Sequence, residues 1–458
     1  MTDGAATPRT PRELLEGMQS AIASRDETLL RALLADLHPA DVAELIANLE
    51  PDERAFAFSI LRRRAPAVLS EVDGEIQSEL LDILGDAEVG RIVKELPSDE
   101  AVDILGVLPE ERALDILRHV GEPEARGIRK LLKFAEDTAG GIMAAEFVAV
   151  HDDATAADAI EELRRRADEL EEHQRVYVID HDGKLVGTLS LGRLLLARPT
   201  TPISQIREGD VISVPTDMDQ EEVAAIVRKY DLVAVPVVDA DGRLVGSISI
   251  DDVIDVIQEE ASEDVARMAG TTDEEIGEES VLRVSTIRLP WLIAGLIGEC
   301  VAALLLSRYE RSLEAVLSLA FFIPVITAMG GNVGMQSSAV IVRALALGEW
   351  NLVDLRRQLF RAVAVAGING LVCGGLLALV ASLWQGDPRL GAVVGVSLFA
   401  GMIVAGITGT FYPLVLRRLR VDPAIASGPF VTVSNDVLNL LIYFTVASLA
   451  LSWLLGSH

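Results

Sequence analysis

The hydrophobic pattern of the chain changes near residue 287. Before that point, apolar residues recur at helix or strand spacing among many charged residues, which is typical of half-buried elements in soluble domains. Beyond it, five apolar stretches are each long enough to cross a bilayer, whose hydrocarbon core takes about 20 apolar residues in a helix. We expect transmembrane helices in Leu289 to Leu306, Ala315 to Val342, Ala362 to Gly386, Leu390 to Leu416 and Pro423 to Leu455.

Residues 25–140 carry repeated signals for the start of a helix. Proline followed by acidic residues suits a helix amino terminus, because proline is tolerated in the first turn and acids favour the helix dipole. Such starts occur at Pro39 and Pro51, and again at Pro97 and Pro109, twelve residues apart within each pair. This spacing predicts stacked helical hairpins, an all-α superhelical domain. Residues 1–24 are expected to form a disordered amino terminus.

An internal repeat follows this helical segment. Residues 176–187 and 235–246 both read as a strand, an Asp-x-Asp-Gly turn and a second strand, and a helix-like segment precedes each copy. The repeat resembles a tandem pair of cystathionine-β-synthase (CBS) domains, which implies two α/β units at residues 141–203 and 204–262. Domains of that type commonly bind adenine nucleotides, so ATP is a candidate ligand.

The two copies differ at a position that matters for a nucleotide. The second copy has Ser249 followed by Asp252, and in CBS domains this Asp usually holds ribose hydroxyls. The first copy has Ser190 followed by Arg193, which replaces the acceptor with a cation. Arg193 therefore argues against nucleotide binding by the first copy.

Charge is distributed unevenly along the chain. The net charge is −30, but residues 1–286 hold 62 acidic and 29 basic residues, whereas the remainder holds 8 acids and 11 Arg, a net of +3. An acidic surface disfavours nucleic acid as a partner, because duplex binding depends on Lys and Arg. Cations are the natural ligands of such a surface, although ordinary solubility is an alternative explanation.

Seven acids are concentrated in fourteen residues at the end of the repeat. A helical spacing places several of them on one face, where like charges repel unless something neutralises them. A solvated helix face is the alternative. We expect residues 263–286 to form a linker helix into the membrane half. The seven are Asp251, Asp252, Asp255, Glu259, Glu260, Glu263 and Asp264.

The orientation in the membrane follows from the loops. Residues 1–19 lack the basic and then apolar pattern of a signal peptide, so the acidic half is expected to stay in the cytoplasm. Arginines are concentrated after the second and fourth spans, which the positive-inside rule places on the cytoplasmic side. We therefore expect a multi-pass protein of the cytoplasmic (inner) membrane, with the amino terminus inside and the carboxyl terminus outside.

Asp436 is the one side chain that ionises at neutral pH in the run from Pro423 to Leu455. A carboxylate at mid-membrane depth costs about 2.5 to 3.5 kcal/mol on insertion scales, so such a residue usually faces a partner or a water-filled path. Asp436 therefore indicates an ion path, and a helix cap at the interface is the alternative. Glu299 in the first span is a second intramembrane acid, which lines the same path or contacts a neighbouring residue.

The second span contains a glycine-rich run, Gly330, Gly331, Asn332 and Gly334, which is unusual for a regular lipid-facing helix. Irregular backbone is tolerated at membrane depth where its carbonyls line a cavity or are buried in protein. The run therefore predicts irregular backbone that supplies oxygen ligands to a pore. Close helix packing through small residues is the alternative.

Catalytic chemistry has no sequence signature here. Cys300 and Cys373 both lie in apolar segments, which excludes a disulfide framework, and the six His form no zinc motif. Without a nucleophile–base pair or a phosphate-binding loop, an enzyme is not expected. A secondary transporter for another cation such as Co²⁺ or H⁺, and a membrane-tethered sensor that conducts nothing, are alternatives to an ion channel.

Three motifs, taken with the domain order, make the chain resemble the MgtE family of magnesium channels and transporters. They are Asp137-Thr-Ala-Gly-Gly-Ile-Met, Gly330-Gly-Asn-Val-Gly-Met-Gln-Ser, and Asp422-Pro-Ala followed by Asp436 in the last span. The resemblance implies a homodimer in the lipid bilayer that conducts Mg²⁺, with Co²⁺ as a second candidate cation. It also implies a multidomain fold of a superhelical domain, a CBS pair, a linker helix and a pore domain of five transmembrane helices at residues 287–458.

The resemblance implies roles for individual residues. Asp436 would hold the permeating ion, Asn332 and the carbonyls of Gly330 and Gly331 would line the path, and Asp422 would lie at its cytoplasmic mouth. Glu299 departs from the family, in which that position is usually small. Regulatory Mg²⁺ would bind between Asp99 and Asp103 of the helical domain and Asp252, Asp255, Glu260, Glu263 and Asp264, with a further site at Asp219, Glu221 and Asp231.

Overall fold

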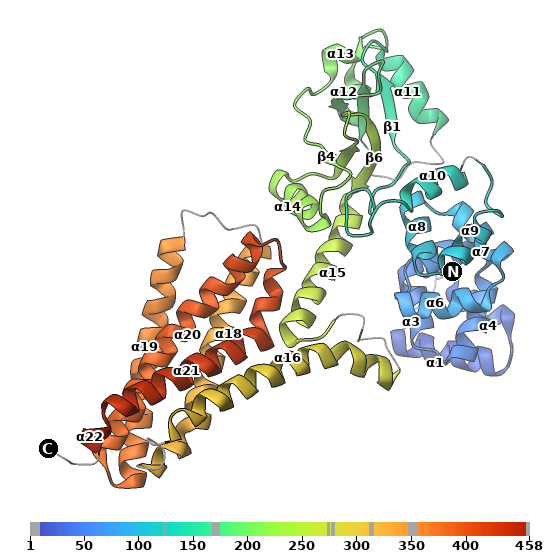
Figure 1. Ribbon diagram of the computed structural model, residues 1–458. Helices are drawn as coiled ribbons and strands as arrows, with labels where there is room; N and C mark the ends of the chain where they lie inside the picture. The colour runs from blue at the N-terminus through green and yellow to red at the C-terminus, as the bar shows by residue number, and fades with distance from the viewer. Residues whose placement is uncertain are drawn as a thin grey trace, which may run out of the picture. The chain divides into compact units, whose positions relative to one another are not determined.

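The computed structural model describes residues 10–122, 124–166, 175–272, 275, 280–310, 316–346 and 355–454 (Figure 1). The chain divides into two compact units, residues 1–256 and 257–458. The first unit holds a helical domain and two small sheets, and the second is helical. This arrangement confirms the predicted multidomain fold class.

Short helices form the amino-terminal domain. Apolar residues one turn apart, such as Leu30 and Leu34 or Val42 and Ile46, are buried together, which makes each helix amphipathic. Their buried faces share one core. The helices are α1 (Pro11–Ala23), α2 (Glu27–Leu34), α3 (Pro39–Ala47), α4 (Pro51–Leu61), η1 (Arg62–Arg64), α5 (Ala65–Leu69), α6 (Gly74–Ile83), α7 (Asp86–Glu95), α8 (Ser98–Gly106), α9 (Glu110–Ile116) and α10 (Glu124–Leu131).

The predicted helix starts are confirmed. Helices α3 and α4 begin at Pro39 and Pro51, and Pro97 and Pro109 are the N-cap residues of α8 and α9. The predicted disorder of residues 1–24 is wrong for its described part, because α1 begins at Pro11 with a capping box on Thr10. Helix α1 also buries Met18 in the domain core, a tertiary contact that the local sequence does not reveal.

The repeat folds into two α/β units, as predicted, and each unit holds a three-stranded sheet, in the orders β1-β2-β3 and β4-β5-β6. The predicted hairpins are β2-β3 and β5-β6, and the first strand of each sheet was not predicted. In each sheet the first two strands are parallel and the last two are antiparallel. The first copy contains β1 (Val148–His151), α11 (Ala156–Arg165), β2 (Val176–Ile179), β3 (Leu185–Leu189), α12 (Leu191–Leu196) and α13 (Ile203–Ile206). The second contains β4 (Val214–Pro215), α14 (Gln220–Tyr230), β5 (Ala234–Val238) and β6 (Leu244–Ser249).

The Asp-x-Asp-Gly turns close both hairpins and join the two copies. Gly183 and Gly242 have φ values of +80° and +79°, which glycine adopts without strain. Leu185 donates its backbone N–H to the carbonyl of Gly242, and Leu244 donates to that of Gly183. This reciprocal pairing fixes the copies against each other.

Helix α15 (Ile250–Ala269) holds the acidic run and continues directly from the second copy. The predicted linker helix over residues 263–286 is therefore not a separate element. Its first part is the end of α15, and its last part belongs to α16 (Val281–Ser307). Residues 273–274 and 276–279 of the prediction lie outside the described residues.

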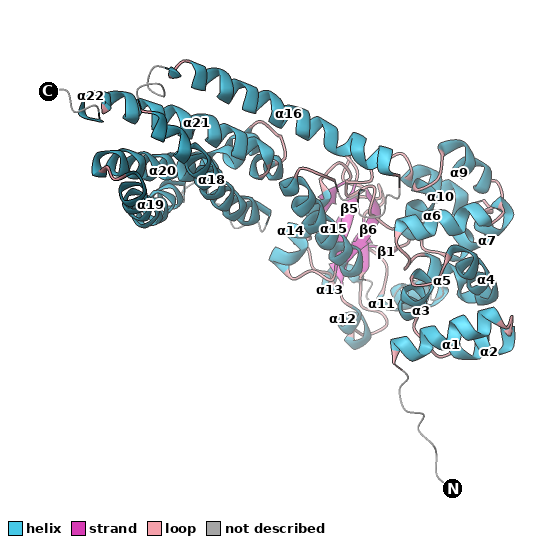
Figure 2. Cartoon of the chain, turned by 90° about the horizontal axis from the view of Figure 1, so that it is seen from below, coloured by secondary structure: helices cyan, strands magenta, loops and turns pink. Residues whose placement is uncertain are grey.

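Five helical segments are long and apolar enough to span a membrane among the residues that the structure describes, as predicted. Helix α20 is the central one, and α18, α19 and α21 surround it (Figure 2). After α16, the elements are η3 (Leu317–Phe322), α18 (Ile323–Ala346), α19 (Leu355–Gln385), α20 (Pro388–Arg418), η5 (Pro423–Ser427), α21 (Pro429–Leu449) and α22 (Leu451–Leu454).

Two details of the membrane prediction are wrong. The glycine-rich run lies inside the continuous helix α18, so its backbone is regular instead of unwound. The last span is shorter than predicted, because residues 423–427 form the 3₁₀ helix η5 and the apolar span covers Phe430–Leu449. Close packing of the glycines against α21 and α20, described below, holds the run in a helical conformation.

Candidate ion site and acidic surfaces

Asp436 lies on α21 opposite the glycines of α18. A Cβ atom placed on Gly331 would lie 3.8 Å from Oδ1 of Asp436, so the absence of a side chain at Gly331 leaves room beside the carboxylate. Oδ1 itself is buried and has no hydrogen-bond partner among the described residues. A buried carboxylate oxygen without a donor is unfavourable unless a cation or water reaches it.

Glu299 on α16 is the acidic neighbour of Asp436. The two helices approach closely, since a Cβ on Gly298 would overlap the side chain of Val433. The Glu299 and Asp436 carboxyl groups are near enough to hydrogen-bond. Glu299 is exposed in the single chain. Two adjacent carboxyl groups favour a species shared between them, either a cation or a proton.

The other residues predicted for the path lie on α18 with different exposure. Gly330 and Gly331 are buried, whereas Asn332 is exposed. Gly330 packs directly against the side chain of Asn439 on α21. The structure therefore places Gly331 beside Asp436 and gives Gly330 a packing role, which was the alternative explanation of the glycine run.

Asp422 caps the amino terminus of η5 and accepts a hydrogen bond from the N–H of Ala424 at 2.8 Å. Its other oxygen contacts the guanidinium of Arg267, which also contacts Glu263 on α15. Burial, together with the charges of Asp422 and Glu260, raises the pKa of Asp264 to about 6. The structure thus brings the predicted acids Asp422, Glu260, Glu263 and Asp264 into one cluster, with Arg267 as its cation.

A second acidic surface joins α8 to the start of α15. Burial raises the pKa of Glu100, and the charges of Glu71, Asp252 and Asp251 add to the effect while a hydrogen bond from Ser70 opposes it. Burial likewise raises the pKa of Asp252, with contributions from neighbouring acids. A raised carboxyl pKa means that the ionised form is penalised, so a cation bound here would relieve the penalty.

The predicted residues of this surface have different environments. Asp99 is 7% exposed, whereas Asp103, one turn later on α8, is exposed. Asp252 accepts hydrogen bonds from the N–H and the hydroxyl of Ser249, at 2.9 and 2.5 Å. Burial raises the pKa of Asp255, and the charge of Asp251 adds to that effect. Glu100, which the sequence prediction omitted, lies close enough to Asp252 for the charge of Asp252 to raise its pKa.

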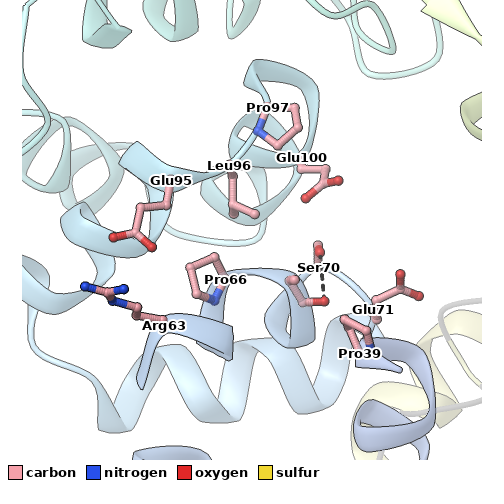
Figure 3. A pocket seen from close by; sticks show the side chains of 10 residues that line it. Pro39, Arg63, Pro66, Ser70, Glu71, Glu95, Leu96, Pro97 and Glu100 are labelled. Atoms are coloured by element: carbon pink, nitrogen blue, oxygen red, sulfur yellow. Dashed lines mark hydrogen bonds between the residues drawn. The ribbon is translucent and has the colours of Figure 1, made fainter. Parts of the chain in front are cut away.

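A cavity of about 280 Å³ opens in the helical domain next to this surface (Figure 3). Arg63 and Glu95 lie at one end of it, and Glu71 and Glu100 lie at the other. Glu100 belongs to the motif Pro97-Ser98-Asp99-Glu100, which predicted the start of a helix, so the sequence did draw attention to this residue. Glu71 gave no signal, because it becomes part of the surface only where the end of α5 and the start of α8 line one cavity.

The acids predicted to form a site in the second repeat are not brought together. Asp219 caps the amino terminus of α14 and accepts from the N–H of Glu221 at 2.9 Å, whereas Asp231 ends the same helix in a left-handed conformation. The helix rises about 1.5 Å per residue, so Asp219 and Asp231 lie roughly 18 Å apart. One chain cannot place all three acids around one ion.

The serine–acid positions of the two repeats also differ in structure. In the first copy, Arg193 lies 3.2 Å from Glu208 and forms an ion pair. The Arg193 guanidinium has only hydrogen-bond donors, so it cannot accept a hydrogen bond from a ribose hydroxyl. The Asp252 carboxylate of the second copy can. Among the described residues, no group of three or more His, Cys, Asp or Glu side chains forms a ready-made metal site.

Comparison with known protein families covers most of the chain. The family model for a divalent cation transporter matches residues 323–446, and the model for the MgtE intracellular N domain matches residues 37–137. The CBS domain model matches residues 139–200 and 203–259. These matches follow the order of the elements described above.

Two curated relatives match the chain over nearly its full length. The magnesium transporter MgtE of Thermus thermophilus is 37% identical over 96% of this chain and 99% of its own length. The magnesium transporter MgtE of Bacillus subtilis is 35% identical over 92% of this chain and 97% of its own length.

Solved structures match the cytoplasmic part. The cytosolic domain of the Mg²⁺ channel MgtE in complex with ATP is 35% identical, with a TM-score of 0.50, and covers 53% of this chain and 99% of that chain. The soluble part of a magnesium transporter is 30% identical, with a TM-score of 0.50, and covers 55% of this chain and all of the other. This chain belongs to the MgtE family of magnesium transporters.

Proposed function

We propose that this protein is a homodimeric channel that conducts Mg²⁺ passively into the cell across the cytoplasmic membrane. The observation that carries the proposal is the buried, unpartnered Oδ1 of Asp436 beside Gly331, inside an apolar span. Relatives named as magnesium transporters support Mg²⁺ as the ion. Co²⁺ is a candidate second substrate because it accepts similar ligands.

The chemistry of Mg²⁺ fits this site. Mg²⁺ keeps several waters in an octahedral shell and is usually held by one or two carboxylates. Asp436 would bind the hydrated ion, and Gly331 would leave space for it. The backbone carbonyls of Gly330 and Gly331 would accept hydrogen bonds from its waters through their second lone pairs, and the exposed Asn332 would also contact these waters. Asp422 would attract ions at the cytoplasmic mouth.

A second copy of the chain would complete the path. In the single chain, the apolar window of α16 is 6% buried, and Glu299 on this helix is exposed. A carboxyl group facing lipid is costly, so a partner copy is the better neighbour. The arginine-rich loops support an amino terminus in the cytoplasm and a carboxyl terminus outside.

Closure of the channel would depend on regulatory Mg²⁺ at the two acidic surfaces. The raised pKa values of Glu100, Asp252 and Asp264 reflect burial and like-charge repulsion, which a divalent cation would relieve. When cytoplasmic Mg²⁺ is abundant, binding would favour a compact, closed state. When Mg²⁺ falls, repulsion would favour the open state, in proportion to the difference in affinity between the two.

The central test replaces the pore carboxylate. Asp436→Asn keeps the size of the side chain and removes its charge, so Mg²⁺ uptake into proteoliposomes is expected to fall to background while the protein still assembles. The matched control is Asp387→Asn, which alters an acid at the start of α20. Wild-type uptake by the Asp436→Asn variant would show that Asp436 does not bind the permeating ion, and the channel proposal would then be wrong.

The contact between Glu299 and Asp436 favours one alternative, a transporter that couples cation and proton movement. Such a transporter would show uptake that depends on an imposed proton gradient, with alkalinisation or acidification of the vesicle lumen. A channel would respond to the Mg²⁺ gradient and membrane potential alone. Measuring lumenal pH during uptake separates the two.

ATP is proposed as a ligand of the second CBS copy, on the precedent of the relative solved with ATP. The first copy is not expected to bind it, because Arg193 is paired with Glu208. Calorimetry should therefore give no more than one ATP per chain. Asp252→Asn should weaken this binding, and Asp182→Asn, in the turn of the first copy, is the control.

A further inference from the structure

We propose that Asn435, Asn439 and Thr408 form a polar seam between α18, α20 and α21 that positions Asp436 for ion selection. The inference rests on the proposed ion path. None of the three residues was singled out by the sequence, because Asn and Thr are uncharged and occur inside apolar spans. The seam residues are positioning residues, since they act through the placement of Asp436.

Asn439 fills a space that exists only because two glycines face it. A Cβ on Gly330 of α18 would overlap the amide of Asn439, and so would a Cβ on Gly401 of α20. The Asn439 side chain is 1% exposed, and its Nδ2 donates to the backbone carbonyl of Asn435 at 2.7 Å. The amide therefore fits in one register of the three helices.

Asn435 repeats this arrangement one turn earlier. It is fully buried, and its Oδ1 accepts a hydrogen bond from the hydroxyl of Thr408 on α20 at 2.7 Å. Its Nδ2 meets Gly334 of α18, where a Cβ would overlap it. Gly334 in turn contacts Gly409 of α20 backbone to backbone. Small residues thus allow close approach, and the amides determine the register.

The seam is more polar than packing alone requires. Nδ2 of Asn435 and Oδ1 of Asn439 are buried without a hydrogen-bond partner among the described residues. Leaving an amide donor or acceptor unpaired in an apolar environment is unfavourable. An apolar side chain of similar size would fill the same space without that penalty, which indicates that the amides serve a purpose besides stability.

The position of Asp436 explains that purpose. It lies between Asn435 and Asn439 on α21, so the two amides fix the rotation and height of the helix segment that bears the carboxylate. The same contacts fix Gly330 and, next to it, Gly331, which faces Asp436. A small rotation of α21 would change the width of the site, and width distinguishes hydrated Mg²⁺ from larger cations such as Ca²⁺.

The test is a double-mutant comparison of full-length protein in proteoliposomes, with uptake of Mg²⁺ and Ca²⁺ measured separately. Asn439→Ala removes the amide without adding atoms, and Gly330→Ala adds the overlapping Cβ. We expect Asn439→Ala to reduce the Mg²⁺ to Ca²⁺ uptake ratio about tenfold, with a smaller effect on the maximal Mg²⁺ rate. Gly375→Ala is the control, because a Cβ at Gly375 on α19 meets nothing within 4 Å.

The double variant Gly330→Ala with Asn439→Ala separates packing from positioning. If the amide positions Asp436, restoring space leaves the ratio as low as in Asn439→Ala. Recovery of the wild-type ratio would show that the seam only fills space and would overturn the proposal. A wild-type ratio in an assembled Asn439→Ala protein would overturn it as well, even if Gly330→Ala fails to fold.

Failure of the seam is distinguishable from failure of the channel proposal. If Asp436→Asn abolishes uptake while Asn439→Ala has a normal ratio, the ion path stands and the seam inference is wrong. If Asp436→Asn transports normally, the ion path itself is wrong, and the seam loses its purpose. Size-exclusion chromatography of each variant confirms that uptake is compared between assembled proteins.

Discussion

The acids of the two units lie in opposite kinds of surroundings. In the first unit, Glu100, Asp252 and Asp255 lie among other acids, and burial with repulsion raises the pKa of each. In the second unit, Gly331 lies beside the Asp436 carboxylate, and Glu299 is its one acidic neighbour among the described residues. The first arrangement responds to how much charge is neutralised. The second depends on how accurately one carboxylate is placed.

Because the two arrangements differ, the two units are sensitive to different kinds of change. A surface built from several similar charges should lose function gradually as charges are removed. A site built from one carboxylate and a tight glycine contact should fail abruptly when the packing changes.

Gly409→Leu should break the membrane unit. A side chain there would overlap the backbone of Gly334, and overpacking of this kind costs about 3 kcal/mol. We expect loss of the monodisperse protein in size-exclusion chromatography and a large fall in the unfolding temperature. Gly375→Leu on α19, where the space is open, is the matched control. Equal behaviour of the two variants would mean that α18 and α20 do not require this contact.

Asp252→Asn with Asp255→Asn should weaken closure in a graded way. The closed state loses two carboxylates that would bind regulatory Mg²⁺, so we expect half-maximal inhibition of uptake to need about tenfold more Mg²⁺, equivalent to about 1.4 kcal/mol. Asp231→Asn, at the far end of α14, serves as the control. If inhibition of uptake depends on Mg²⁺ concentration as in the wild type, the acids between α8 and α15 are solvated surface charges and do not bind regulatory Mg²⁺.

Arg267→Gln should have a smaller effect on closure. Arg267 joins the end of α15 to the start of η5 through its contacts with Glu263 and Asp422. Its removal should favour the open state and raise residual uptake at high Mg²⁺ about threefold, the scale of one partly exposed ion pair. Arg228→Gln, on α14, is the control. Residual uptake below that of the wild type would mean that Arg267 competes with Mg²⁺ instead of stabilising closure.

The smallest expected effect is the pH dependence of stability in the absence of Mg²⁺. The folded-state pKa of Asp264 is raised to about 6 from 3.8, so the ionised carboxylate opposes folding above pH 6 and protonation relieves this as the pH falls. Asp264 is partly exposed, so the free energy of unfolding should rise by less than about 0.4 kcal/mol as the pH falls from 7 to 6.

Unfolding temperatures at the two pH values measure this effect, with chelator present throughout. Asp264→Asn should remove the rise seen in the wild-type protein. A rise of the same size in the variant would assign the dependence to another group in the acidic cluster.

Local sequence patterns determined much of the molecule. The five spans, the helix starts at Pro39 and Pro51 and the two Asp-x-Asp-Gly turns follow from periodicity, proline and glycine, which act over a few residues. Asp436 was identified because an isolated charge in an apolar run is unusual in any fold. The acids of α15 were identified because they lie close together in sequence. Their grouping with Asp422 was not predicted, because it depends on the contact between α15 and η5.

Tertiary structure decided the rest. The glycine run is a regular helix because Asn435 and Asn439, about a hundred residues later, fill the space that the glycines leave. Asp219 and Asp231 are separated because α14 lies between them, and Glu71 and Glu100 share a cavity because two helices pack there. The sequence alone specified which groups carry charge and which segments are apolar. Only packing decided which of those groups meet, since contact between distant residues depends on the fold as a whole.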